Sequence, residues 1–143
     1  MNKKFLTLTV LAILFSLSMF SVAYASTHRA SEYLSYYSAY ITTSSNGKVT
    51  VNFDVNATST VDLVGAKTIV LQERENSSKS WNAVKTFSYT SYPNMLRSNA
   101  ATNFSSVSYN GISGYSYRAK VYFYAEKGGY DTAEYLTQSV VAK

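Results

Sequence analysis

The segment 115–131, YSYRAKVYFYAEKGGYD, holds the residues whose types and spacing could do chemistry. If it forms a strand, Arg118, Lys120, Tyr122 and Tyr124 share one face, because side chains alternate in direction along a strand. Tyrosines two positions apart then stand about 6.7 Å apart. Rings at that spacing can stack on a sugar or on a partner's side chains, and flanking cations add attraction. We predict a binding site here; the alternative is an ordinary solvated sheet surface, since tyrosine also favours strands.

The opposite face of this segment is apolar. Val121 and Phe123 alternate with the polar residues and predict a core face. Tyr117 follows a glycine turn at the start of the strand, where immunoglobulin-like sandwiches place a corner tyrosine that bonds back to the preceding connection. We therefore expect Tyr117, Val121 and Phe123 to be structural, with Tyr115 as the second candidate for the corner.

Acid–base chemistry has few residues to work with. The single histidine, His28, lies in a segment without periodicity, and cysteine is absent, so zinc sites and Ser-His-Asp triads are not expected. We predict no enzyme activity and no cofactor. A glycosidase needs only two carboxylates, so a hydrolase is a third hypothesis. It requires two of five acids to meet in one pocket: Asp54, Glu73, Glu75, Asp131 and Glu134. We expect Glu73 and Glu75 to flank a polar turn rather than a cleft.

The first 25 residues have the layout of a secretory signal peptide. A basic start is followed by an apolar stretch over 5–22, and Ala23, Tyr24 and Ala25 match the small-x-small pattern that precedes cleavage. The alternative is an uncleaved anchor, because the stretch nears the ~20 residues that span a bilayer. The cleavage pattern favours a signal peptide, so we predict a secreted, extracellular protein with no membrane segment after cleavage before Ser26.

The length and the charge of the chain limit the number of domains and the kinds of partner to be expected. A chain of 143 residues favours one domain after signal removal, and a cysteine-free secreted domain fits export from a bacterium. The formal charge of +5 falls to +3 without Lys3 and Lys4. The remaining cations are scattered, and only Arg118 and Lys120 clearly share a face, so nucleic acid is not an expected partner.

The elements that position these residues are predicted to be strands. The segment 48–56, KVTVNFDVN, alternates strictly and follows Asn46 and Gly47, a tight-turn signal. Residues 57–66 break the pattern, with one helical turn expected at 62–65, and 90–101 is expected to be the longest loop. Seven strands are predicted, at 31–43, 48–56, 67–75, 81–89, 104–110, 117–125 and 131–142. This spacing predicts an antiparallel, seven-stranded sandwich of immunoglobulin or fibronectin-III type over 34–142, after a flexible segment at 26–33.

Three segments carry a resemblance to a known family: SAYITTSSNGKVTVNFDV, VDLVGAKTIVLQERENSSKSWNAVKTF and YRAKVYFYAEKGG. They resemble small secreted proteins of Gram-positive, clostridia-like bacteria that are catalogued as a domain of unknown function, over roughly 34–141. The shared features are a strand–turn–Trp–strand unit around Trp81 and the tyrosine-led strand at 117–125. The resemblance implies an all-β, extracellular sandwich in which Trp81 is structural. It transfers no catalytic or ligand residues.

The leading functional hypothesis is a secreted, non-catalytic module that binds a cell-surface or extracellular component. A cell-wall glycan or a surface protein is the expected partner, held by the outward pair Tyr122 and Tyr124. The alternative is a structural or self-associating protein, which would pair exposed tyrosine-rich strand edges such as 33–40 with those of other molecules.

Overall fold

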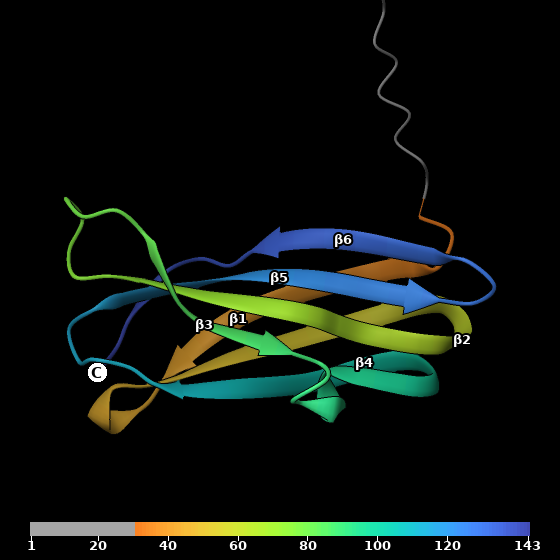
Figure 1. Ribbon diagram of the computed structural model, residues 1–143, viewed down its shortest axis with the longest axis horizontal. Helices are drawn as coiled ribbons and strands as arrows, with labels where there is room; N and C mark the ends of the chain where they lie inside the picture. The colour runs from red at the N-terminus through yellow and green to blue at the C-terminus, as the bar shows by residue number, and fades with distance from the viewer. Residues whose placement is uncertain (1–30) are drawn as a thin grey trace, which may run out of the picture. The chain divides into compact units, whose positions relative to one another are not determined.

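The computed structural model describes residues 31–143 (Figure 1). The predicted signal peptide, His28 and most of the segment 26–33 lie outside the described residues. The described part contains seven strands and two short 3₁₀ turns: β1 (Leu34–Thr43), η1 (Ser45–Gly47), β2 (Lys48–Arg74), β3 (Asn82–Ser88), η2 (Pro93–Met95), β4 (Leu96–Asn110), β5 (Ser116–Glu126), β6 (Tyr130–Leu136) and β7 (Val140–Val141). None of its helices is long and apolar enough to cross a membrane.

All seven strands belong to one antiparallel sheet built around β2. The first half of β2 pairs with β1 on one side and with β4 on the other. Its second half pairs with β5 in place of β1, and β3 takes over from β4. Strand β5 in turn pairs with β6 and β7. The prediction of an all-β, antiparallel protein is confirmed.

Strand β2 runs without a break for 27 residues, so the interruption and helical turn predicted at 57–66 are wrong. The alternation fails there because the pairing register shifts between Asn56 and Val61 and again beside Ala66. Such shifts are β-bulges, which bend a strand and increase its twist while the chain stays extended. Gly65, at φ +154°, lies in this bend, where an added Cβ would meet a backbone oxygen at 2.0 Å.

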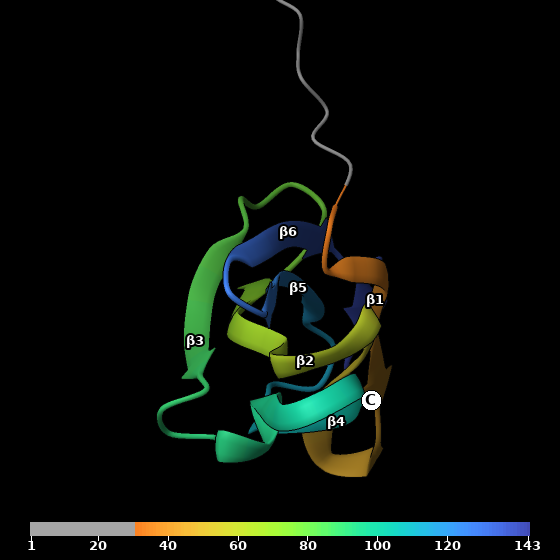
Figure 2. The ribbon, with the colours of Figure 1, turned by 90° about the vertical axis from the view of Figure 1, so that its right-hand side faces the viewer.

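The bend in β2 brings its two halves face to face around one core. Phe53 from the first half meets Phe123 of β5 edge-on, with ring centroids 6.3 Å apart. In the end-on view of Figure 2, β5 and β6 lie above, β4 below and β1 to the right of a common interior. The sheet is therefore curled, and its assignment to an immunoglobulin- or fibronectin-III-like sandwich stays a prediction.

Two further predicted segments need correction. Strand β4 begins at Leu96, inside the loop expected at 90–101, because its first residues pair with β2 from Val61 to Gly65. The last strand, expected at 131–142, is divided into β6 and β7. Thr137 separates them, since its Oγ1 accepts the N–H of Ala119 at 2.9 Å.

Side-chain and terminal contacts close the curled sheet. Asp131 Oδ2, at the start of β6, accepts the N–H of Tyr33 at 2.6 Å, the hydroxyl of Ser31 at 2.8 Å and the N–H of Leu34 at 3.4 Å. At the other end, the carbonyl oxygen of Lys143 accepts the N–H of Gly47 at 2.7 Å. These contacts tie β1 and the C-terminus to the rest of the sheet.

Candidate functional site

The inner face of β5 lies in the core. Tyr117, Val121 and Phe123 are completely buried, as predicted. The hydroxyl oxygen of Tyr117 accepts the N–H of Ile112 at 2.8 Å and donates its proton to Glu73 Oε2, also at 2.8 Å. The first bond runs back to the β4–β5 connection, as expected of a corner tyrosine. Burial, aided by the negative charge of Glu73, raises the pKa of Tyr117 to about 12.

The outer face of β5 is not the exposed tyrosine pair that the sequence predicts. Tyr124 is only 8% exposed. Its ring stacks on Tyr130 at a centroid distance of 5.8 Å, and Lys67 Nζ lies 4.4 Å from the ring centroid. Its hydroxyl donates to Glu126 Oε2 at 2.7 Å, and burial raises the pKa of Tyr124 to about 12. Tyr124 is therefore covered, and Tyr122 is left as a single half-buried ring.

The two cations of the predicted site point outward but already have partners. Lys120 Nζ pairs with Glu134 Oε1 at 3.1 Å. Arg118 Nε donates to Gln72 Oε1 at 2.8 Å, and the Arg118 guanidinium lies 4.4 Å from the centroid of the Trp81 ring. The structure thus brings Arg118 together with Trp81, which the sequence assigned only a structural role.

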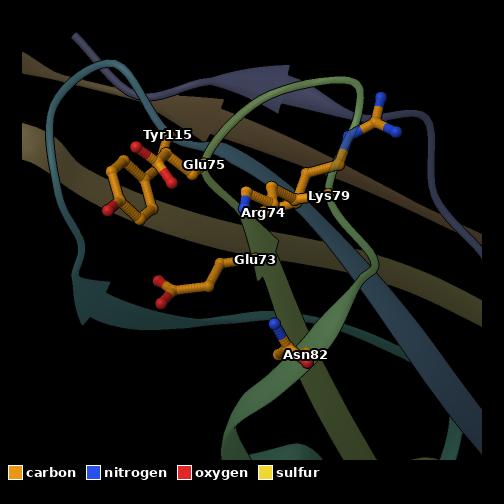
Figure 3. Close-up of a pocket in the computed structure, with 6 residues that line it drawn as sticks. All are labelled: Glu73, Arg74, Glu75, Lys79, Asn82 and Tyr115. Atoms are coloured by element: carbon orange, nitrogen blue, oxygen red, sulfur yellow. The ribbon is translucent and has the colours of Figure 1, made fainter.

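A second group of residues lines a pocket of about 310 Å³ where β2 ends (Figure 3). Its lining residues are Glu73, Arg74, Glu75, Lys79, Asn82 and Tyr115. The expectation that Glu73 and Glu75 flank a turn without a cleft is therefore wrong: both line an open pocket, together with residues of the turn and with Tyr115 of the β4–β5 connection.

The hydrolase hypothesis needs two of its five candidate acids in one pocket, and this pocket contains two of them, Glu73 and Glu75. Glu73, among the last paired residues of β2, and Glu75, just beyond the end of the strand, extend to the same side of the chain (Figure 3). The two carboxylates of a glycosidase lie on opposite sides of the bond that they cleave. Glu73 and Glu75, in contrast, both extend from the same wall of the pocket. Glu73 is also engaged by the Tyr117 hydroxyl. The other acids lie elsewhere: Asp54 on the outer face of β2, Asp131 against Tyr33, and Glu134 with Lys120.

An exposed aromatic surface lies on the other half of the sheet; sequence reasoning expected exposed tyrosines at 33–40, but only as a pairing edge and without Phe104 beside them. We call this surface the β1–β2–β4 face. Tyr36 and Tyr40 of β1 are each 49% exposed, and Phe104 of β4 is 67% exposed. They share one face because directly paired residues of antiparallel strands point the same way: Tyr40 pairs with Asn52, and Phe104 pairs with Asp54.

The rest of this face carries short polar side chains. These are Ser38, Thr42, Thr50, Asn52, Asp54, Asn56, Thr102, Ser106 and Ser108. Asp54 is the only charged residue among these, and Lys48, exposed at the end of the same face where it pairs with Asn110, adds one positive charge. Asn52 Nδ2 donates to Thr42 Oγ1 at 3.2 Å, and the hydroxyls of Thr50 and Ser108 lie 2.9 Å apart. The alternation of 48–56 predicts the polar side of β2, but the aromatic residues come from its neighbours.

Within residues 31–143, no three His, Cys, Asp or Glu side chains gather as ligands of a metal ion. A scan against protein-family models and searches of curated proteins and of solved structures find no match to this chain. The family resemblance therefore stays a prediction, and the assignment of function depends on the surfaces described above.

Proposed function

We propose that the protein is an exported, non-catalytic β-protein that binds a neutral polysaccharide through the β1–β2–β4 face. The observation that carries the proposal is the presence of three exposed rings, Tyr36, Tyr40 and Phe104, on one surface of hydroxyl and amide groups. This site replaces Tyr122 and Tyr124, because Tyr124 is covered by Lys67 and Tyr130.

The chemistry of this face matches that of a sugar chain. The C–H side of a sugar ring packs on an aromatic ring, and its hydroxyl groups need donors and acceptors at the same surface. Asn52 and Asn56 supply both, and Asp54 accepts strongly because it is charged. One carboxylate, Asp54, and one ammonium group, Lys48, leave this face without net charge, which favours an uncharged ligand.

The spacing of the rings favours a chain over a single sugar. Tyr36 and Tyr40 are four residues apart on β1, about 13 Å along the strand. Phe104 lies two strands away, about 10 Å across the sheet. Rings this far apart contact different sugar units. The described pocket lies elsewhere, beside Glu73, so this surface suits a polymer that lies across it.

Export is the second part of the proposal. It is supported by the signal-peptide pattern of residues 1–25 and by the resemblance to small secreted proteins of Gram-positive bacteria. Mass spectrometry of the protein from culture medium is expected to give Ser26 as its first residue. An intact Met1 in the membrane fraction would instead favour the uncleaved anchor.

An immunoglobulin- or fibronectin-III-like sandwich is part of the same proposal. Two observations support it: the corner bond from Ile112 to Tyr117, and the meeting of Phe53 with Phe123 between facing halves of the sheet. An experimental structure with an up-and-down strand order around a closed barrel would refute this assignment.

The alternative, self-association through the edge at 33–40, has less support. Tyr37 packs against Phe123 and Tyr135, and Asp131 binds the backbone of Tyr33 and Leu34. The Asp131 contact occupies backbone N–H groups at the start of the β1 edge, which leaves less of it for pairing with another molecule. Sedimentation that gives a monomer at high concentration would remove this alternative.

Binding is tested by pull-down with insoluble neutral polysaccharides and with purified peptidoglycan. Removing one ring, as in Phe104→Ala, is expected to weaken binding roughly two- to tenfold, and removing all three to abolish it. Tyr130→Ala is the matched control, since Tyr130 is 68% exposed against 67% for Phe104 but lies on the other half of the sheet. Equal loss in both variants, or no binding by the wild type to any of these polymers, would refute the proposal.

A further inference from the structure

Two arginines lie against the only tryptophan of the chain, on the outer face of the β2–β5 half of the sheet. The guanidinium carbon of Arg74 is 4.5 Å from the centroid of the Trp81 ring, and that of Arg118 is 4.4 Å from it. The two guanidinium groups are therefore no more than about 9 Å apart. They come from different elements: Arg74 ends β2, Arg118 belongs to β5, and Trp81 precedes β3.

No carboxylate neutralises these two charges. In the described part of the chain, Lys120 and Glu134 form the single ion pair, and neither arginine takes part in one. Glu73, the neighbour of Arg74, points to the other face and accepts the Tyr117 hydroxyl. Two like charges held this close repel each other. An anion between or beside them would remove that repulsion.

The arginines also have donors to offer. Arg118 uses Nε on Gln72, which fixes the orientation of its guanidinium plane. Arg74 Nε is buried without a hydrogen-bond partner among residues 31–143, so the donors that Arg74 offers to a ligand are its two terminal nitrogens. The Trp81 ring holds both planes, so less conformational freedom remains to be lost when a ligand binds. The pocket beside Arg74 is lined by one further cation, Lys79, and by the carboxylates Glu73 and Glu75, neither of which forms an ion pair with Arg74.

We propose that Arg74, Trp81 and Arg118 form a binding site for the phosphate groups of an anionic polymer. A planar guanidinium binds two phosphate oxygens at once, which an ammonium group cannot do. Two such groups up to 9 Å apart can each take one phosphate of the same chain. This site is on the other half of the sheet from the β1–β2–β4 face, and it does not depend on the polysaccharide proposal.

Trp81 itself reports binding, because the chain has one tryptophan. The exported protein is titrated with long-chain inorganic polyphosphate at low salt while Trp81 fluorescence is followed. We expect a saturable change that weakens as salt is raised, since binding releases counterions from the polymer. Inorganic phosphate, which offers one group only, is expected to bind at least tenfold more weakly.

Arg74→Gln and Arg118→Gln are each expected to weaken polyphosphate binding about tenfold or more, through loss of charge-assisted hydrogen bonds. Arg118→Lys keeps the positive charge but loses the planar guanidinium that binds two phosphate oxygens at once, so this variant should also bind polyphosphate more weakly than the wild type. Arg97→Gln is the matched control. It removes the same charge from an exposed position on β4 and should change the affinity less than twofold. Phe104→Ala should have no effect. Near-ultraviolet circular dichroism verifies that each variant is folded.

Several results would overturn the proposal. No fluorescence change with polyphosphate at low salt would mean that the site does not exist. An Arg97→Gln variant as weak as Arg74→Gln would mean attraction by net charge alone. Tighter binding to phosphatidylglycerol vesicles than to polyphosphate would identify the surface as a membrane contact rather than a polymer site.

Discussion

Replacing Tyr117 by phenylalanine would remove one oxygen atom from the interior and, with it, two hydrogen bonds. The N–H of Ile112 would lose its acceptor, and Glu73 would lose the hydroxyl that donates to its carboxylate. The ring would keep its place, because Tyr117 is completely buried and packs against Tyr109 at a centroid distance of 6.4 Å. The substitution therefore isolates the contribution of the hydroxyl group.

The expected loss is about 2–3 kcal/mol in the free energy of unfolding. A buried backbone N–H without a partner costs about 1–3 kcal/mol, and a hydrogen bond to a charged group contributes about 1.5–3 kcal/mol. Glu73 is only half-buried and can regain water, so its share lies at the low end. For a domain of this size, each kcal/mol lowers Tm by about 4 °C. Tyr117→Phe should thus lower Tm by about 8–12 °C.

The assay is thermal and urea unfolding followed by circular dichroism, with Tyr122→Phe as the matched control. Tyr122 lies on the outer face of the same strand, and its hydroxyl bonds no other described residue. Its loss should cost less than about 0.5 kcal/mol. If Tyr117→Phe lowered the free energy of unfolding by no more than Tyr122→Phe, the corner hydrogen bond would contribute nothing to stability. The structural role of the Tyr117 hydroxyl would then be refuted.

The pH dependence gives an independent check. The pKa of Tyr117 is raised from 10.0 to about 12 in the folded protein, so folding favours the neutral hydroxyl. This contribution to stability is complete below pH 10 and is lost as the pH rises to about 12. Tyr124 has the same shift. Tyr117→Phe should therefore lessen, without abolishing, the fall in stability between pH 10 and 12; an unchanged fall would contradict the assignment.

Two further predictions concern the closure and the bend of the sheet. Burial opposes ionisation of Asp131, but hydrogen bonds from Tyr33, Ser31 and Leu34 outweigh it and hold the pKa of Asp131 below its ordinary value. Its contribution is therefore complete above pH 4 and is lost as the pH falls further. Asp131→Asn should cost about 1–2 kcal/mol and speed amide hydrogen exchange at Tyr33 and Leu34; unchanged exchange would show that this contact does not hold β1. Gly65→Ala would place a Cβ 2.0 Å from the Met95 carbonyl oxygen and should cost about 3 kcal/mol or more. Gly114→Ala, at φ +88° but with nothing within 4 Å, should cost about 1–2 kcal/mol by urea unfolding; equal losses would mean that the bend tolerates a side chain.

The sequence by itself determined the all-β class and the inner face of two strands. Val121 and Phe123 alternate with polar residues, and so do the valines at 49, 51 and 55, and all of them are buried. Alternation with a period of two predicts which side chains are buried, because one face of a half-buried strand must avoid water. The corner position of Tyr117 was also predictable, since it depends on a nearby turn and on the start of one strand.

The tertiary structure alone decided which surfaces are exposed. Residues 57–66 lose their alternation, which a turn and a bulged strand do equally; only pairing with β4 and β5 distinguishes the two. Tyr124 is covered by Lys67 and Tyr130, one of which lies far away in sequence. Phe104 joins Tyr40 on one face only because β4 and β1 pair with opposite sides of β2. Alternation within a strand specifies the face of the sheet to which each side chain points. Which side chains lie next to each other across the sheet depends on pairing between strands that are distant in sequence, and no local pattern encodes this pairing.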